Sequence, residues 1–232
     1  MKLLMLSSSR AGDEGYLETA CPMIINHLNA ITNVLFVPYA GVTIGWDDYT
    51  QMVQEALPTL SVTSIHTAAN PQLAVEQADA ILVGGGNTFH LLHTLYALNL
   101  ITALKARITA GTPYIGWSAG SNICGHSIRT TNDMPIIEPA SFNALNVVPF
   151  QLNPHYTDYV APGHNGETRD QRIAEFCALH ADMPVLGIQE GTALEVIDDR
   201  MRLVGELAGV VFKGTDKISI QPNADLSHYL KA

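Results

Sequence analysis

The chain has few basic residues: its 232 residues include 12 Lys and Arg against 22 Asp and Glu, giving a formal net charge of −10. Binding to DNA, RNA or an anionic membrane surface requires clustered Lys and Arg that neutralise phosphates. The composition therefore argues against nucleic acid and membrane as partners. A substrate that is itself an anion has to be bound by a local cationic group that acts against the overall surface charge.

Cysteine is also scarce, with Cys21, Cys124 and Cys177 scattered along the sequence. Three separated cysteines indicate neither a disulfide framework nor a Cys-rich zinc site, and free thiols fit a reducing compartment. No apolar run approaches the roughly 20 residues that cross a bilayer. The short run after Lys2 ends at Ser7 without a cleavage-like site, so we expect a soluble, cytoplasmic protein.

Short apolar runs alternate with longer amphipathic stretches, which is typical of a parallel sheet flanked by helices. Most of the apolar runs lack strict alternation, as strands buried on both faces do. The predicted strands are residues 2–6, 34–38, 61–66, 80–83, 114–117 and 185–188. The predicted helices are residues 16–28, 47–57, 71–77, 88–98, 101–110 and 168–180.

The C-terminal part of the sequence has a different pattern. Segments 193–197, 202–204 and 210–213 are brief, rich in β-branched residues and joined by turn residues, which predicts antiparallel strands at one edge of the sheet. No low-complexity stretch, repeat or Pro/Gly/Ser-rich linker interrupts the chain. We expect a single catalytic α/β domain over residues 1–232, a three-layer sandwich with a mostly parallel central sheet, flanking helices and antiparallel strands at the C-terminal edge.

The sharpest local signal is the run YIGWSAG over residues 114–120. An apolar strand leads into Gly-x-Ser-x-Gly and then into a short helix candidate, which is the nucleophile-elbow pattern. Ser118 would lie in a tight, strained turn at a helix N-terminus, where backbone amides favour developing negative charge. The alternative interpretation is an ordinary strand–helix turn, because Gly and Ser are common in turns.

A second glycine-rich turn lies in the run ILVGGGNT over residues 81–88. An apolar strand, expected to be buried, ends in three glycines. Asn87 and Thr88 are both good helix caps, so a helix is expected to follow. Such a loop can serve as a phosphate or dinucleotide cradle, as half of an oxyanion hole, or as a purely structural turn. Neither G-x-x-x-x-G-K-[ST] nor an early G-x-G-x-x-G is present, which favours the oxyanion role beside an elbow serine.

A serine nucleophile needs a base, and His126, His155 and His164 lie outside the predicted helices and strands. His155 follows an apolar run that ends in Asn153 and Pro154, so it emerges on a loop at a strand end. Catalytic groups of α/β proteins commonly occupy such loops. These features favour His155 as the base.

A carboxylate that orients the histidine would complete the set. Glu190 lies between a predicted buried strand and a glycine, and Asp133 lies in the run TTNDMP over residues 130–135. The residues alone leave both candidates open. No H-E-x-x-H or other His/Cys spacing indicates a metal site, so we expect neither metal nor cofactor.

Taken together, these motifs resemble the peptidase E family of bacterial α-aspartyl dipeptidases, whose fold is like that of class I glutamine amidotransferases. The similar stretches occur in order along most of the chain. They are PYAGVT (38–43), VGGGNTF (83–89), YIGWSAG (114–120), IRTTNDMPI (128–136), NPH (153–155) and GHNGETR (163–169).

The resemblance implies a role for each of several residues. It implies a triad of Ser118 as nucleophile, His155 as general base and Glu190 as third member, and an oxyanion hole formed by the amides of Gly86 and Ala119. It also implies that Arg169 binds the β-carboxylate of an N-terminal aspartate, with Asn87 and Asp133 near the substrate. A guanidinium suits this task because it stays charged and pairs with a carboxylate through two hydrogen bonds.

The resemblance therefore implies a serine exopeptidase, monomeric or homodimeric, that hydrolyses Asp-Xaa dipeptides through an acyl-enzyme. Two alternatives stay open. The same triad would suit another aspartyl amide, such as a cyanophycin-like polymer. A non-catalytic binding protein would keep the elbow only as architecture.

Overall fold

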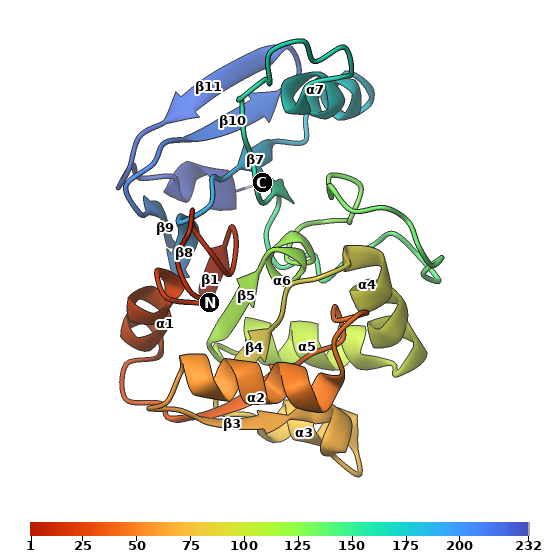
Figure 1. Ribbon diagram of the computed structural model, residues 1–232, viewed down its shortest axis with the longest axis vertical. Helices are drawn as coiled ribbons and strands as arrows, with labels where there is room; N and C mark the ends of the chain where they lie inside the picture. The colour runs from red at the N-terminus through yellow and green to blue at the C-terminus, as the bar shows by residue number, and fades with distance from the viewer. Residues whose placement is uncertain (232) are drawn as a thin grey trace.

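The computed structural model describes residues 1–231, and its centre is a seven-stranded sheet in the order β3-β2-β4-β5-β1-β8-β9 (Figure 1). All pairings among the first five strands in this order are parallel, whereas β8 and β9 are antiparallel to their neighbours. The strands are β1 (Lys2–Leu6), β2 (Asn33–Val37), β3 (Ser61–Ser64), β4 (Ile81–Val83), β5 (Tyr114–Trp117), β8 (Ala193–Ile197) and β9 (Arg200–Val204).

A second sheet of four strands, in the order β11-β10-β7-β6, lies beyond the central sheet at the top of Figure 1. Its strands are β6 (Gln151–Asn153), β7 (Val185–Gly187), β10 (Gly209–Lys213) and β11 (Asp216–Ile220). The pair β6–β7 is parallel and the other two pairs are antiparallel. Helix α7 (Arg169–Leu179) packs on this sheet through Ile173 and Cys177, which share a small core with Val185 and Phe212.

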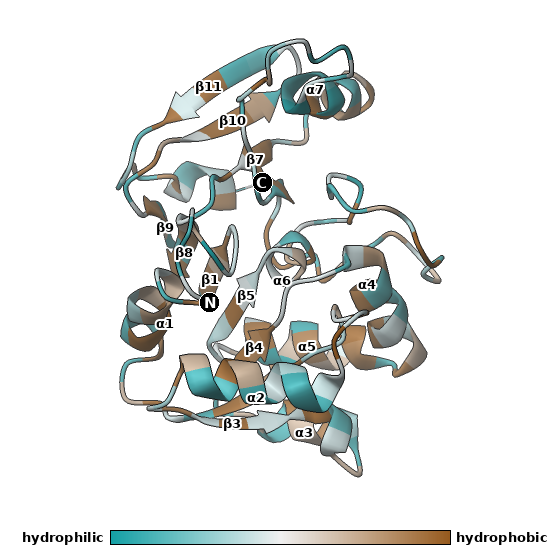
Figure 2. Cartoon of the chain, in the orientation of Figure 1, coloured by the Kyte–Doolittle hydropathy of each residue, from teal (hydrophilic) through white to brown (hydrophobic). Residues whose placement is uncertain are grey.

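Helices cover both faces of the central sheet. They are α1 (Ala20–Leu28), α2 (Trp46–Ala56), α3 (Pro71–Gln77), α4 (Thr88–Ala97), α5 (Leu100–Thr109) and the short α6 (Ala119–Asn122), with 3₁₀ turns η1 (Ile65–Thr67) and η2 (Ser227–Leu230). Alternate residues of β1 point to opposite faces: Leu3 and Met5 belong to the core under α3, α4 and α5, and Leu4 and Leu6 to the core under α1 and α2. Figure 2 shows the resulting brown strands between helices with teal outer faces.

The sequence correctly predicts a mostly parallel sheet flanked by helices, with antiparallel strands following at its edge. It wrongly assigns segments 185–188 and 210–213 to the central sheet, whereas both contribute strands to the second sheet. A short apolar run has the same pattern in either sheet, so the pattern cannot distinguish them. The sequence also misses β6, which has only three residues, and β11, whose first four residues are exposed.

Helix α1 begins at Ala20 rather than at residue 16 as predicted, and residues 16–19 form turns. Leu17 has a φ of +57°, which lies outside the right-handed helical region. Within residues 1–231, no helix combines the length and the apolar character that a membrane span requires.

A buried histidine joins α1 to the antiparallel edge of the central sheet. The His27 side chain is fully buried, and its Nδ1 lies 3.2 Å from Oε1 of Glu195 on β8. The other oxygen of Glu195 accepts two hydrogen bonds from Arg202 on β9, at 2.9 and 2.7 Å. Burial, the largest effect, holds the pKa of His27 below its ordinary value of 6.5.

We predict that the free energy of unfolding falls as the pH drops from 6.5 towards 5. The unfolded chain takes up a proton on residue 27 in this range while the folded chain resists it, so acid favours unfolding. Burial raises the pKa of Glu195, but the hydrogen bonds with Arg202 and His27 outweigh it and hold this pKa below its ordinary value of 4.5. The contribution of Glu195 to stability is therefore lost only at lower pH.

Urea unfolding at pH 7, 6 and 5 measures this effect. His27→Asn, which keeps a donor for Glu195 but does not titrate, should show a shallower loss than the wild type. The control His126→Asn changes an exposed histidine and should follow the wild type. Identical pH slopes for all three proteins would refute the prediction.

Candidate active site

The carboxyl ends of β1, β4 and β5 meet at one edge of the central sheet because the three strands are parallel and adjacent. The loops that leave these ends carry Ser7, the three glycines and Ser118. The parallel strands β6 and β7 of the second sheet end at the same place and lead into His155 and Glu190. Backbone hydrogen bonds from Ile188 N to Asn153 O (3.2 Å) and from Tyr156 N to Ile188 O (3.0 Å) join these two loops.

Ser118 occupies the sharp turn between β5 and α6, with a φ of +52°. A non-glycine residue in this left-handed region is strained and persists only when its surroundings hold it there. The turn is tight because Gly120 packs against β4, where an added Cβ would lie 2.2 Å from the carbonyl oxygen of Val83. This close approach explains why the sequence pattern requires a glycine at position 120.

The structure brings Ser118, His155 and Glu190 together. His155 Nε2 lies 2.9 Å from Ser118 Oγ, and His155 Nδ1 lies 2.7 Å from Glu190 Oε1. An ionised carboxylate only accepts hydrogen bonds, so Nδ1 carries the proton and Nε2 is left to accept from the serine hydroxyl. This is the arrangement in which a neutral imidazole can act as a general base.

Of the two carboxylates that the sequence leaves open, Glu190 is the one that contacts His155. Asp133 instead binds the start of α4: its Oδ2 accepts hydrogen bonds from Thr88 N at 2.7 Å, from the Thr88 hydroxyl and from the Thr131 hydroxyl. Asp133 nevertheless lines the same cleft as Ser118. The residue pattern alone could not rank the two residues because each lies in a polar turn, and it was the family resemblance that implied Glu190.

Two backbone N–H groups beside Ser118 have no acceptor among the described residues, those of Gly86 and Ala119. Gly86 has a φ of +135°, and a Cβ there would lie 2.2 Å from the carbonyl oxygen of Ala40. The hydrogen bond from Asn87 N to Ala40 O, 2.9 Å long, holds the loop in this position. Two unpaired amides beside a serine at a strand–helix turn could form an oxyanion hole.

Arg169 begins α7 and lines the cleft. Its Nη1 is buried and has no hydrogen-bond partner in residues 1–231. Burial, followed by the charge of Arg172, lowers the pKa of Arg169 below its ordinary value, although a guanidinium stays charged in proteins. An unpaired, partly buried cation at the edge of a cleft can receive an anionic group.

Asn87 serves the loop rather than the open cleft. Its Oδ1 caps α4 by accepting from His90 N at 3.0 Å, and its Nδ2 donates to Met134 O at 2.9 Å. Both polar ends of the side chain are therefore occupied within the chain. The sequence places Asn87 near the substrate, and the structure places it on the loop that carries Gly86.

The cleft at Ser118 has a volume of about 220 Å³. It is smaller than the roughly 300–1,000 Å³ of pockets that hold drug-sized ligands, so it suits a small substrate. It is lined by Thr88, Ser118, Ala119, Asn122, Thr131, Asn132, Asp133, Pro154, His155 and Arg169. Sequence reasoning assigned no role at the substrate to Thr88, Asn122, Thr131, Asn132 and Pro154, although all but Asn122 lie within the motifs that carry the resemblance.

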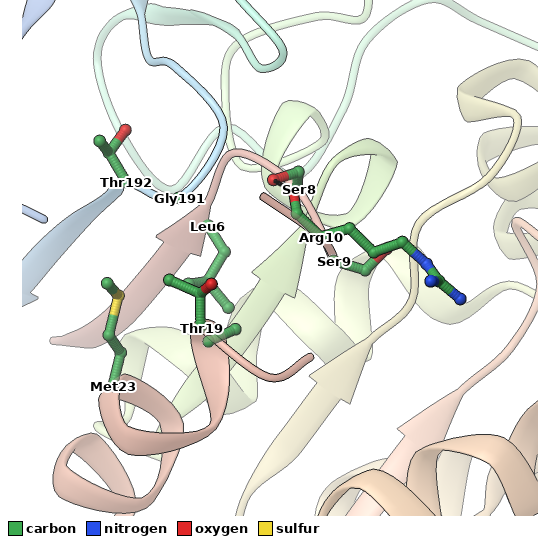
Figure 3. A pocket seen from close by; sticks show the side chains of 9 residues that line it. Leu6, Ser8, Ser9, Arg10, Thr19, Met23, Gly191 and Thr192 are labelled. Carbon is green, nitrogen blue, oxygen red and sulfur yellow. Dashed lines mark hydrogen bonds between the residues drawn. The ribbon is translucent and has the colours of Figure 1, made fainter. Parts of the chain in front are cut away.

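A much smaller cavity lies beside Gly191, one residue after Glu190. Figure 3 shows it between Thr19 and Met23 on one side and Ser8, Arg10 and the 191–192 turn on the other. Its volume of about 10 Å³ is close to the space of a single water molecule. It therefore cannot hold a substrate, and the cleft at Ser118 is the candidate substrate site.

Ser7, which follows β1, ties the central sheet to the loops of the second sheet. Ser7 is fully buried. Its hydroxyl donates a hydrogen bond to Ile188 O at 2.8 Å and accepts one from His155 N at 2.8 Å. The backbone N–H of Ser7 donates to Thr192 O at 2.9 Å. One residue thus holds the backbone on both sides of Glu190 and at His155 itself.

We predict that Ser7→Ala lowers the free energy of unfolding by about 1–3 kcal/mol, because it leaves the His155 N–H without a partner and removes one of the two hydrogen bonds to the buried Ile188 carbonyl. Chemical denaturation measures the change. Ser8→Ala is the matched control, since the Ser8 hydroxyl bonds to the nearby Arg10 O and does not connect the sheets. Equal losses in the two variants would contradict the prediction.

An imidazole that links a carboxylate to a hydroxyl at a strand–helix turn places the chain among the serine hydrolases of α/β fold. Comparison with known proteins then identifies the family. The model of peptidase family S51 matches residues 3–204. Peptidase E of Shewanella amazonensis is 53% identical over 233 residues, 99% of each chain, and peptidase E of Shewanella denitrificans is 54% identical over 230 residues, 98% of each.

The chain therefore belongs to peptidase family S51, and it is a serine dipeptidase of the peptidase E type. Solved structures agree on the fold. A peptidase from an acI-B1 actinobacterium superposes with a TM-score of 0.72 at 16% identity, over 97% of this chain and 96% of that one. A structure from Listeria monocytogenes superposes with a TM-score of 0.64 at 23% identity, over 95% and 98%.

Proposed function

We propose that the chain removes an N-terminal aspartate from dipeptides, with Ser118 as nucleophile, His155 as general base and Glu190 as the third member of the triad. The observation that carries this proposal is the continuous contact from Glu190 through His155 to Ser118, at 2.7 and 2.9 Å. In the first step His155 Nε2 accepts the serine proton while Ser118 Oγ attacks the carbonyl carbon of the aspartyl residue. Glu190 stabilises the imidazolium that forms.

The negative charge that develops on the substrate oxygen is stabilised by the N–H groups of Gly86 and Ala119. Both groups lack an acceptor in the described part of the chain, so they need no rearrangement to bind the oxyanion. His155 then gives its proton to the leaving amine, and the C–N bond breaks. Water, activated by the same histidine, attacks the acyl-enzyme and releases free aspartate.

Recognition of the aspartate falls to Arg169. Its unpaired Nη1 lies at the same cleft as Ser118, and a carboxylate would give it the partner that the protein lacks. Asp133 lines this cleft and carries the charge that suits the substrate's α-ammonium group. Asn87 acts through its two hydrogen bonds, which hold the loop of Gly86 beside residue 134.

Replacement of the nucleophile tests the catalytic proposal. Ser118→Ala should lower turnover of Asp-Leu by several orders of magnitude, because the acyl-enzyme can no longer form. A serine-directed phosphonylating reagent should add one group to the wild type, at Ser118, and none to the variant. Full turnover by Ser118→Ala would overturn the proposal, and the absence of an adduct on the wild type would favour a non-catalytic binding protein.

The selectivity for aspartate tests Arg169. Arg169→Met should lower kcat/KM for Asp-Leu by roughly 100-fold, since it removes a charged hydrogen bond to the substrate, and should change Asn-Leu far less. The matched control is Arg172→Met, which changes an exposed arginine of the same helix that faces Glu167 at 3.8 Å and should retain wild-type selectivity. If Arg169→Met kept its preference for Asp-Leu over Asn-Leu, the assignment would fail.

The alternative substrate is another aspartyl amide, such as a cyanophycin-like polymer. The volume of about 220 Å³ favours a short substrate over a polymer. Comparing Asp-Leu with β-aspartyl dipeptides and longer peptides separates the two possibilities. A cytoplasmic location, a monomeric or homodimeric state and action without a cofactor stay predictions from the sequence.

A further inference from the structure

The peptide between Gly85 and Gly86 presents the Gly85 carbonyl on one side and the Gly86 N–H on the other. It is trans, since residues 1–231 contain no cis peptide, and in a trans peptide the C=O and the following N–H point in opposite directions. The Gly86 N–H is the proposed oxyanion donor. Whatever holds the Gly85 carbonyl therefore also sets the direction of this donor.

The group that holds the Gly85 carbonyl is the Tyr49 hydroxyl, on α2. It donates to Gly85 O at 2.9 Å and accepts from Trp117 Nε1 at 3.2 Å. Trp117 directly precedes Ser118. Two hydrogen bonds thus connect the residue before the nucleophile, through Tyr49, to the peptide that forms the other side of the oxyanion hole.

Tyr49 and Trp117 are buried and packed against a third ring. Tyr49 is 4% exposed and Trp117 is 1% exposed. The Phe36 ring stacks on the Trp117 ring with 5.8 Å between ring centroids, and it meets the Tyr49 ring edge-on with 5.0 Å between centroids. The hydroxyl also explains the first glycine of the loop, because a Cβ at Gly84 would lie 2.6 Å from it. Burial raises the pKa of Tyr49, so the hydroxyl remains a donor.

A hydrogen bond to the carbonyl of a peptide polarises the whole amide and strengthens its N–H as a donor, more so in a buried site than in water. The hydroxyl therefore has two effects on Gly86, one on direction and one on donor strength. Both effects matter most when the substrate oxygen carries a negative charge, which occurs only in the tetrahedral transition state.

We propose that Tyr49 is a positioning residue for the oxyanion hole, which acts through the Gly85–Gly86 peptide and is itself oriented by Trp117. This inference rests on the proposed role of the Gly86 amide. Tyr49 does not touch the substrate. Its contribution is realised in the transition state and not in the binding of substrate or product.

The test replaces the hydroxyl and keeps the ring. Tyr49→Phe should lower kcat for Asp-Leu by roughly 10-fold, the effect of one hydrogen bond of average strength, with KM nearly unchanged. The affinity for an aspartate aldehyde, which forms a tetrahedral adduct with the nucleophile, should fall by the same factor as kcat/KM. The affinity for free aspartate and the pH profile of kcat/KM should stay as in the wild type.

The matched control is Tyr114→Phe. The Tyr114 hydroxyl is equally buried and donates to another glycine carbonyl of the elbow, Gly120 O, at 2.6 Å. The amide of that peptide, Ser121 N, is already bonded to Ser118 O at 3.0 Å, so it cannot serve the oxyanion. Tyr114→Phe should lower the stability while leaving the ratio of aldehyde to aspartate affinity unchanged.

An unchanged kcat in Tyr49→Phe, or an equal loss of aldehyde and aspartate affinity, would overturn the inference. Ring-fluorinated tyrosines at position 49, which keep the hydroxyl and vary its acidity, give the same test without loss of the donor. Activity should rise with phenol acidity, and a flat response would also overturn the inference. Phosphonylation of Ser118 in the wild type tests the proposed function separately. No adduct there would overturn the proposed function and this inference together, whereas an adduct combined with an unchanged kcat in Tyr49→Phe would overturn this inference alone.

Discussion

The proposed site depends on one buried hydroxyl, that of Ser7, because the residues of the proposed triad are divided between two sheets. Ser118 lies at the end of β5 in the central sheet, whereas His155 and Glu190 follow β6 and β7 of the second sheet. Ser7 Oγ bonds to the backbone of both loops of the second sheet at 2.8 Å. Since hydrogen bonds weaken steeply when stretched or bent, this bridge sets the separation at which the serine–histidine contact of 2.9 Å can form.

Backbone strain is concentrated at Ser118 and His155. Ser118 and His155 both have positive φ, +52° and +53°, which costs of order 1–3 kcal/mol for each non-glycine residue. Hydrogen bonds hold both backbones: Ser118 N donates to Leu6 O, and His155 N to Ser7 Oγ. The carboxyl end of β1 therefore anchors both strained residues, and the neighbouring peptide of Gly85 is held by Tyr49. The groups of the proposed triad and oxyanion hole are therefore held in position by the protein itself, without a substrate.

Charge is distributed so that a single group can select an anion. The chain carries a formal net charge of −10, and exposed charges farther away than about 8–10 Å are largely screened by salt. The partly buried guanidinium of Arg169 is screened less and has an unpaired Nη1. Local burial therefore outweighs the sign of the whole surface, which reconciles an acidic protein with the proposed aspartyl substrate.

The sequence alone determined the parallel half of the fold and the sharp strand–helix turn at Ser118, because both depend on local order: buried strands are continuous apolar runs, and the turn needs its glycine within two residues of the serine. Four features lie beyond the local residue pattern. These are the second sheet, the contact of His155 with Glu190 rather than Asp133, which only the family resemblance implied, the bridge at Ser7, and the contact of Tyr49 with Gly85. Each joins residues that are far apart in the chain, and a serine after a strand or a tyrosine on an amphipathic helix has the same local pattern whether or not it makes such a contact. Distance in space, which the packing of two sheets and a helix sets, is the quantity that a one-dimensional pattern does not contain.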